Sequence, residues 1–182
     1  MEFRELSGQR IRLINLNIEY LHDIHEYSIM PQFYDHLEYP PFKDLEETRA
    51  FLTKLFKRSD EISGHYWFIY NISEEKVIGT IGLLDIDRRK GSAELAYGLS
   101  PNYWGRGFFS EALILVIDWY FSLDSTHRLF IKTAEKNINS IKAAKKLGFK
   151  MEGVLRGYYL DDKTSQRWDA ALLSMLRTDI IN

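Results

Sequence analysis

The spacing of apolar residues changes along the chain, and each change predicts a new element. Apolar residues recur at helical spacing over 17–28 and over 44–56, which predicts two amphipathic helices. Asp44, followed by Glu47, forms a capping box that predicts the start of the second helix. A short strand over 10–13 is expected before both helices.

The middle of the chain has the composition of strands. Residues 65–72 and 77–86 are rich in β-branched and aromatic side chains, and a turn at 74–76 lies between them. A further strand over 92–99 follows the turn at 87–91. Because these strands are close in sequence, we expect an antiparallel meander.

The second half of the chain predicts a helix between two strands and then a further helix. Residues 108–123 are apolar on nearly every side, which indicates a deeply buried helix. The elements expected after it are a strand, a short helix ending at Gly148 and two strands, over 128–134, 137–148, 149–160 and 167–176. The crossover should place residues 128–133 parallel to residues 92–99. The expected fold class is α/β with a mixed sheet, in one domain over residues 1–182.

The composition excludes several classes of partner and of functional site. The chain has 45% hydrophobic and 27% charged residues, a formal net charge of −2 and no long basic run, which argues against nucleic-acid binding. The absence of cysteine excludes disulfides, thiolate metal sites and a cysteine nucleophile. His22 and His25 have no evident third ligand, so no metal is expected. With no apolar run long enough to span a bilayer and no signal-peptide pattern, we expect a cytoplasmic protein with no membrane partner.

A glycine-rich loop precedes the buried helix. Gly105 and Gly107 flank Arg106 between a predicted strand and the helix. Such a loop either turns the chain and caps the helix, or directs backbone N–H groups and the positive helix end towards a phosphate. The pattern alone decides neither, because it lacks Walker spacing and has Ser110 where a dinucleotide fingerprint has glycine.

Two longer stretches give the loop a context. AELAYGLSPNYWGRGFFSEA (93–112) and EKNINSIKAAKKLGFKMEGVLRG (135–157) resemble the GNAT superfamily of acetyl-CoA-dependent N-acetyltransferases, most closely its RimJ/RimL-like branch. The similarity extends over roughly residues 8–178. It implies a mostly antiparallel, splayed sheet with a central β-α-β crossover and helices on both faces.

The resemblance also implies acetyl-CoA as cosubstrate. Residues 104–110 would wrap its pyrophosphate, and pantetheine would lie where strands 92–99 and 128–133 separate near their C-terminal ends, pairing with residues 97–99 like an added strand. The cofactor-binding residues implied are Tyr97, Gly98, Leu99, Trp104, Gly105, Arg106, Gly107, Phe108, Phe109, Ser110 and Asn137. Trp104 and Phe109 depart from the general pattern of the family, and Phe109 stands where a small residue is usual.

Amine acetylation needs a base for the amine and a proton for the leaving thiolate. Family precedent makes Glu94 the base or an amine ligand; the alternative is a salt-bridged strand residue. Many members use a tyrosine as the acid, and the corresponding residue here is Ala144. The resemblance to RimL-like enzymes makes Ser140 the candidate acid instead; the alternative is an ordinary serine at the start of a helix, where it caps backbone N–H groups. Asn137 either caps that helix or binds pantetheine.

The resemblance implies a primary amine as acceptor, either a protein or peptide N-terminal α-amine or a small molecule. A polyamine is the weaker version because Ala144 replaces the tyrosine. His36, Glu38 and Tyr39 are candidate acceptor contacts; the alternative for each is loop packing. A CoA-binding sensor without turnover is the alternative of another class. Homodimers are common in the family, and the last two strands are the expected interface.

Overall fold

The computed structural model describes residues 2–60 and 64–180. Its strands are β1 (Leu6–Ser7), β2 (Ile11–Asn15), β3 (His65–Asn71), β4 (Lys76–Asp87), β5 (Ser92–Leu99), β6 (Arg128–Ala134), β7 (Lys150–Leu160) and β8 (Arg167–Leu176). Its helices are η1 (Ile18–Tyr20), α1 (Leu21–Ser28), η2 (Pro31–Tyr34), α2 (Leu45–Asp60), η3 (Pro101–Tyr103), α3 (Phe108–Ser122), α4 (Ile138–Lys146) and α5 (Arg177–Ile180), of which η1, η2 and η3 are 3-10 helices.

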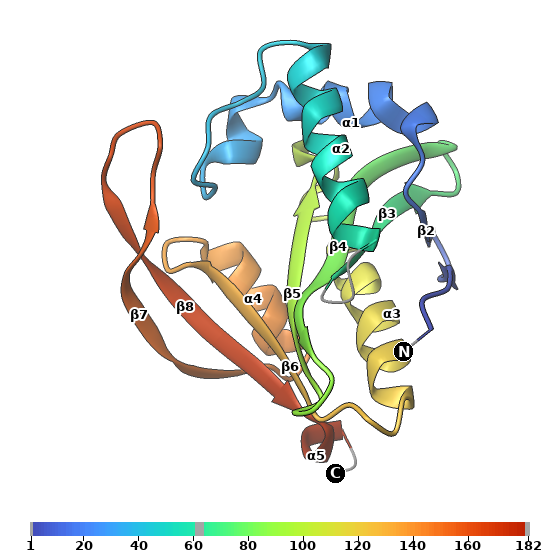
Figure 1. Cartoon of the computed structure of the whole chain (residues 1–182), viewed down its shortest axis with the longest axis vertical. Coiled ribbons are helices and arrows are strands. Elements are labelled where there is room, and N and C mark those ends of the chain that lie inside the picture. The colour runs from blue at the N-terminus through green and yellow to red at the C-terminus, as the bar shows by residue number, and fades with distance from the viewer. Residues whose placement is uncertain (1, 61–63, 181–182) are drawn as a thin grey trace.

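Within these described ranges, the strands form one 8-stranded sheet in the order β1-β2-β3-β4-β5-β6-β8-β7. Neighbouring strands are antiparallel except for β5 and β6, which are parallel and joined by the crossover through α3. The predicted meander and the predicted parallel pair are therefore both confirmed. At one end of the sheet the strand order departs from the order in the sequence, because β8 lies between β6 and β7 (Figure 1).

The sheet is covered on both faces. One core contains apolar residues of α3 and α4 and the sheet residues that face them, including Leu95, Leu113 and Ile141. A second core contains residues of α1 and α2 against the opposite face, including Ile24 and Leu52. The helices on both faces, which the sequence resemblance implied, are thus present.

The structure refines several predicted elements. The capping box starts α2, because the N–H of Glu47 donates to Asp44 Oδ1 at 2.9 Å, although the Glu47 carboxylate accepts from Lys43 N–H instead of that of Asp44. Helix α3 is less enclosed than predicted, since Ile114 on its outer side is 43% exposed. Strand β1 and helices η2, η3 and α5 were not predicted, because two to four residues are too short to show a period.

Strands β5 and β6 separate early. They pair only where Ser92–Glu94 lies beside Arg128–Phe130. Beyond this point β5 stays paired with β4, up to Leu99 opposite Gly79, while β6 stays paired with β8. The separation was expected, but its position near Leu99 was wrong: each strand is held by its outer neighbour, so the two part directly after Glu94. We call this point the fork.

In the part of the chain that the structure describes, no helix combines the length and the apolar character needed to cross a bilayer.

His65, at the start of β3, lies in an aromatic environment. Its ring stacks on Phe3 with centroids 4.0 Å apart and meets the Trp67 ring edge-on at 4.4 Å. Its Nε2 atom is buried and has no hydrogen-bond partner in the described part of the chain. Burial lowers the pKa of His65 to about 4, so the folded protein holds this ring neutral near pH 7.

We therefore expect the free energy of unfolding to decrease as the pH falls from 6.5 towards about 4, because the unfolded chain takes up the proton first. His65→Phe keeps the ring stacking and removes the titrating group, so it should lose less stability over this window than the wild type. Urea titrations across the window measure the difference. The exposed His22→Gln is the control and should follow the wild type; the same pH dependence in His65→Phe would contradict the prediction.

Candidate active site

The fork opens into a cleft of about 630 Å³. Residues from β5, the loop before α3, α4 and the η2 segment line it, and we call it the fork cleft. Its lining residues are Gln32, Phe33, Asp35, His36, Leu37, Tyr97, Gly98, Leu99, Tyr103, Trp104, Gly105, Gly107, Phe109, Ser110, Asn137, Asn139, Ser140, Ala143 and Lys146. Most of the predicted cofactor-binding residues, from the stretch 97–110 and from Asn137, are thereby brought together.

The backbone of β5 directs hydrogen-bonding groups towards the cleft, of which the Leu99 carbonyl accepts from the Trp104 indole N–H. Ser100 N–H donates to the Ile78 carbonyl at 2.8 Å, so residues 98 and 100 direct their backbone groups towards β4. The alternating pattern of an antiparallel pair turns the backbone groups of Tyr97 and Leu99 the other way, into the gap left by β6. An extended ligand could pair there as an extra strand would.

The glycine loop, residues 104–110, leads into α3. Gly107 is its N-cap and has a φ of 83°, a left-handed conformation that favours glycine. Arg10, far away in the sequence, holds the loop: its Nη1 donates to the Arg106 carbonyl at 2.8 Å, and its Nε pairs with Glu111 at 2.8 Å. Burial tends to raise the pKa of Glu111, but the hydrogen bonds from Arg10 outweigh it and lower the pKa.

Two predicted loop residues point away from the cleft. The Arg106 guanidinium lies over the rings of Tyr103 and Phe108, at 5.3 and 5.2 Å from their centroids. The Phe108 side chain is buried in the core. Neither side chain lines the cleft, so their contribution there is limited to the backbone.

The two unusual loop residues are both accommodated. The Trp104 indole N–H donates to the Leu99 carbonyl at 2.7 Å and ties the loop to the end of β5. The Phe109 ring packs on Tyr97 with centroids 4.4 Å apart. The large residue at position 109 therefore forms one wall of the cleft together with Tyr97.

A pair of hydroxyls lies in the cleft. Those of Tyr97 and Ser140 share a hydrogen bond of 2.6 Å. Burial raises the pKa of Tyr97 to about 12, so this hydroxyl keeps its proton near pH 7. The Asn137 side chain accepts from Ser140 N–H at 3.2 Å, which is the capping contact that was one of its two interpretations. Ala144 is fully buried and is not among the lining residues.

Glu94 lies at the fork itself and not in the lining of the cleft. Its carboxylate pairs with the Lys132 ammonium at 2.7 Å, and Lys132 also donates to the Tyr158 hydroxyl at 2.6 Å. Burial raises the pKa of Glu94, against the opposing effect of Lys132. The salt bridge that was the alternative interpretation of Glu94 is thus present, in a half-buried position.

The three candidate acceptor contacts lie in different surroundings. His36 lines the cleft. Glu38 accepts from Leu160 N–H at 3.2 Å through its carboxylate and from Asp162 N–H at 2.7 Å through its carbonyl, and Tyr39 packs against the ring of Phe42. These two fit the loop-packing alternative.

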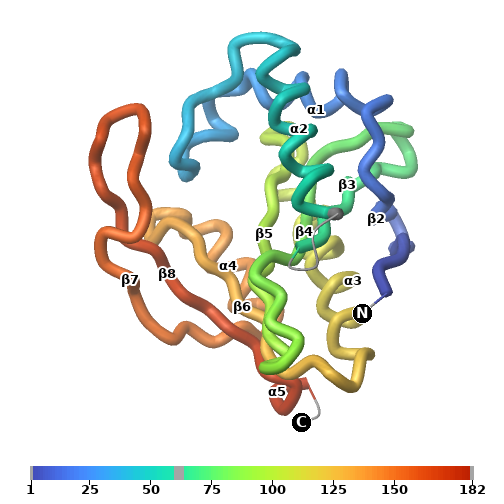
Figure 2. The backbone as a smooth tube through the Cα atoms, in the orientation of Figure 1, coloured from blue at the N-terminus to red at the C-terminus, as the bar shows by residue number. Residues whose placement is uncertain are grey.

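Further hydrogen bonds join the segment around Glu38 to the β7–β8 turn. Lys163, in the β7–β8 turn, donates to the carbonyls of Tyr34 and Leu37 at 2.9 and 3.2 Å. The segment after η2 is thereby joined to the tip of the β7–β8 hairpin, and the two approach each other above the fork in Figure 2. This link involves polar loop residues without a periodic pattern, so the sequence contained no signal for it.

Some lining residues were missed, including Phe33 and Asn139. For Phe33 the available signal in the sequence was Gly98, a glycine inside a strand. A Cβ at this position would lie 2.8 Å from the Phe33 ring. A glycine inside a strand often marks such a close approach.

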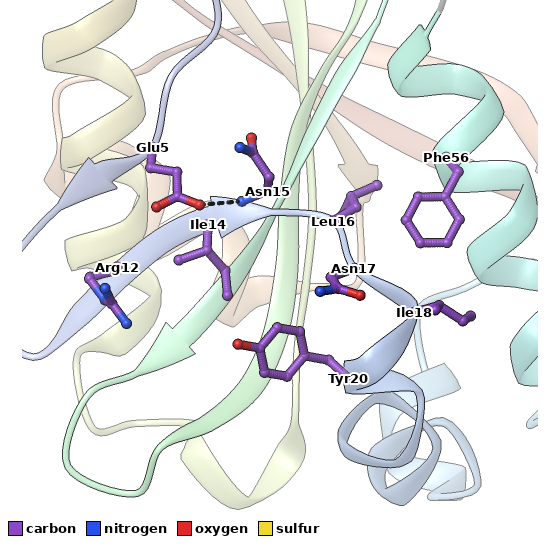
Figure 3. A pocket seen from close by; sticks show the side chains of 9 residues that line it. All are labelled: Glu5, Arg12, Ile14, Asn15, Leu16, Asn17, Ile18, Tyr20 and Phe56. Carbon is purple, nitrogen blue, oxygen red and sulfur yellow. Dashed lines mark hydrogen bonds between the residues drawn. The ribbon is translucent and has the colours of Figure 1, made fainter.

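A second cavity of about 550 Å³ lies beside β2. Figure 3 shows around it side chains from the N-terminal segment, from β2, from the turn and η1 that follow it, and from α2. Its polar groups have protein partners: Glu5 accepts from Asn15 N–H at 3.1 Å, and Arg12 lies 5.0 Å from the Tyr70 ring. We therefore place the candidate site in the fork cleft. Within residues 2–60 and 64–180, no three His, Asp or Glu side chains are grouped so that they could hold a metal ion.

Comparisons with known proteins show the family and the fold of the chain. The family model for the acetyltransferase (GNAT) domain matches residues 10–150. Uncharacterized N-acetyltransferase p20 of Bacillus licheniformis is 31% identical over 175 residues, which span 96% of this chain and 97% of that protein.

Two solved structures show the fold with a ligand. Spermidine N-acetyltransferase from Vibrio cholerae, in complex with CoA and spermine, superposes with a TM-score of 0.79 at 18% identity over 96% of this chain and all of that one. RimL, a ribosomal L7/L12 α-N-protein acetyltransferase in complex with coenzyme A, superposes with a TM-score of 0.83 at 16% identity over 95% of this chain and 98% of that one. At these identities the likeness concerns the fold.

Gly107→Ala should destabilise the protein. An alanine at this left-handed position costs about 1–2 kcal/mol, and its Cβ would lie 3.2 Å from Arg10 Nη2, which the loop depends on. Urea titration measures the loss in the free energy of unfolding. Gly153→Ala, where a Cβ meets nothing within 4 Å, is the matched control. Equal stability of the two variants would contradict the prediction.

Proposed function

The chain belongs to the GNAT acetyltransferase family, and on this premise we propose that it transfers the acetyl group of acetyl-CoA to a primary amine by direct attack in a ternary complex at the fork. The observation that carries the proposal is the fork itself. It joins unpaired strand backbone, a glycine loop at a helix N-terminus and a pair of hydroxyls in one cleft.

Acetyl-CoA occupies the fork cleft in this proposal. The backbone groups of Tyr97 and Leu99 bind pantetheine, and the N–H groups of residues 104–110 bind the pyrophosphate. Support comes from the direction of the β5 backbone and from the loop conformation that Arg10 and Trp104 hold. The CoA bound in the two structural neighbours is consistent with this cosubstrate.

Glu94 and Tyr97 lie on opposite faces of β5. Ala96, two residues after Glu94, packs against the core of α1 and α2, whereas Tyr97 packs against the core of α3 and α4. Alternation along the strand therefore places Glu94 on the α1/α2 face, away from Tyr97. In the proposal, the amine arrives from the side of Glu94 and acetyl-CoA from the side of Tyr97.

Glu94 is the proposed base. It accepts the proton of the attacking amine directly or through water, while a backbone N–H near Leu99 polarises the thioester carbonyl. Burial raises the pKa of Glu94, which brings its basicity closer to what proton transfer near pH 7 requires.

Ser140 is the proposed proton donor to the leaving thiolate. Its hydrogen bond with Tyr97 supports this role, since the Tyr97 hydroxyl, protonated near pH 7, can resupply the proton. The two hydroxyls would together replace the tyrosine that is absent at Ala144.

The proposed acceptor is a protein or peptide N-terminal α-amine, as in the RimJ/RimL-like branch, or a small amine. The structural neighbours include an enzyme for each class, one with spermine bound and one that is an α-N-protein acetyltransferase. His36 is the candidate contact for which the geometry offers the most support, because it lines the cleft.

Glu94→Gln should abolish most of the turnover and leave acetyl-CoA binding intact. A general base contributes about 10²–10⁴-fold to rate, and Glu94 does not line the cleft. The assay is thiol release from acetyl-CoA against peptides with varied first residues, spermidine, amino sugars, amino acids and aminoglycosides, with binding measured by calorimetry.

Glu46→Gln, on the exposed side of α2, is the control and should match the wild type. Unchanged turnover in Glu94→Gln would exclude Glu94 as base. Acetyl-CoA binding by the wild type without turnover on any amine would favour a CoA sensor, and no acetyl-CoA binding would overturn the proposed function.

Ser140→Ala and Tyr97→Phe should each reduce kcat by about 10²-fold if the two hydroxyls act as one proton relay. The double variant should then be little slower than either single one, because removing one member already breaks the relay. Steady-state kinetics on the four proteins measure this cycle. Losses that multiply in the double variant would contradict a shared role.

A further inference from the structure

We propose that Lys132 is the positioning residue of the site: it holds Glu94 at the fork as an ionised carboxylate, and Tyr158 holds Lys132. The inference rests on the proposed function and assigns the base a partner from the neighbouring strand. It starts from the only ion pair that Glu94 forms with a described residue, at 2.7 Å.

The register of the sheet brings the two side chains together. Glu94 lies beside Phe130 in the last position at which β5 and β6 are paired. Lys132 is two residues further along β6 and so points to the same face. A long side chain from there reaches back across the gap that opens after Glu94, and the lysine thus bridges the two strands where their backbone pairing ends.

The pair is shielded from water, unlike an ordinary surface salt bridge. The side chains of Lys132 and Glu94 are 16% and 12% exposed. Exposed ion pairs contribute little, and burying a pair gives little net stability because both charges lose their hydration. Stability therefore gives little reason for this pair, whereas a base at the acceptor side of the fork does need to be charged before it can accept a proton.

Among the described residues, Lys132 is the cation that acts on Glu94. From β4, the Asp85 carboxylate acts on Glu94 with the same sign of charge. Tyr66 on β3 and Tyr159 on β7 face Glu94 with neutral hydroxyls, and Arg58 of α2 is directed to the Tyr66 hydroxyl. Burial raises the pKa of Glu94, and Asp85 adds to the rise; Lys132 is the group that opposes both.

Tyr158 fixes Lys132 from the other side. Its hydroxyl accepts from the Lys132 ammonium at 2.6 Å, and the ammonium lies 5.0 Å from the centroid of its ring. Burial tends to lower the pKa of Lys132, but Glu94 and Tyr158 outweigh it and raise the pKa. Lys132 therefore keeps its proton while Glu94 is free to gain one.

The transfer step is consistent with these protonation states. The amine nitrogen bonds to the acetyl carbon, the bond from that carbon to sulfur breaks, and the thiolate takes its proton from Ser140. One amine proton ends on the Glu94 carboxylate and passes to solvent, and solvent returns a proton to the Tyr97–Ser140 pair. Lys132 does not exchange its own proton. Lys132 thus acts through Glu94 and does not touch the reacting atoms.

The first measurement does not depend on turnover. The ¹³C NMR signal of the Glu94 carboxyl carbon is assigned by its absence from the spectrum of Glu94→Gln. It is then followed over pH in the wild type, Lys132→Met, Lys132→Arg and Tyr158→Phe. Removing a cation at this distance should raise the Glu94 pKa by about one to three pH units. Lys132→Arg should restore it, and Tyr158→Phe should give a smaller rise. Lys54→Met, an exposed lysine of α2, should leave it unchanged.

An unchanged Glu94 pKa in Lys132→Met would overturn the inference, whatever the activity of the protein. Should Lys132→Met not fold, Lys132→Arg together with the neutral pair Glu94→Gln/Lys132→Met, which leaves no unpaired charge, separates loss of the charge from loss of the fold. A shift in Lys132→Arg as large as that expected for Lys132→Met would also count against the inference.

The second measurement is the pH dependence of kcat/KM for an amine that the wild type acetylates. In Lys132→Met, the acidic limb should move to higher pH by the same amount as the NMR titration, with acetyl-CoA affinity unchanged. An NMR shift without a shift of this limb would contradict Glu94 as base and leave the pairing intact. Wild type without turnover on any amine would contradict the proposed function, while the titration still decides the role of Lys132.

Discussion

The separation of β5 from β6 is the constraint on which the rest of the site depends. Each strand keeps its outer neighbour, β4 for one and β8 for the other, so neither can follow its inner partner beyond Glu94 and Phe130. Backbone groups left without a ladder partner need another one. The fork therefore leaves backbone donors and acceptors beside a cleft, between two central strands of the sheet.

The glycine loop is held by distant parts of the chain. Arg10, just before β2, bonds the Arg106 carbonyl and pairs with Glu111 in the first turn of α3, and Trp104 ties the loop to the end of β5. The left-handed Gly107 completes the turn into the helix. A preorganised loop of this kind gives up little conformational entropy when a phosphate binds, which is how a few backbone N–H groups can suffice.

The sheet also separates the polar groups of the site. Glu94 and its partner Lys132 belong to the α1/α2 side, while the Tyr97–Ser140 pair belongs to the α3/α4 side, and the two sides communicate only where the strands have parted. In an acetyl transfer, a base is needed where the amine arrives and an acid where the thiolate leaves. In the proposed reaction, the parted sheet supplies both without placing the two groups in contact, so they do not neutralise each other.

The sequence by itself determined the order of the longer elements, the start of α2 at its capping box, the parallel crossover and the residues of the glycine loop, because these depend on periodicity and on neighbours close along the chain. Only the tertiary structure decided where the strands part, that Lys132 meets Glu94, and that Tyr97 meets Ser140. These depend on sheet register and on contacts between residues far apart in the chain. Alternation along β5 shows that Glu94 and Tyr97 face opposite ways, but not what faces them.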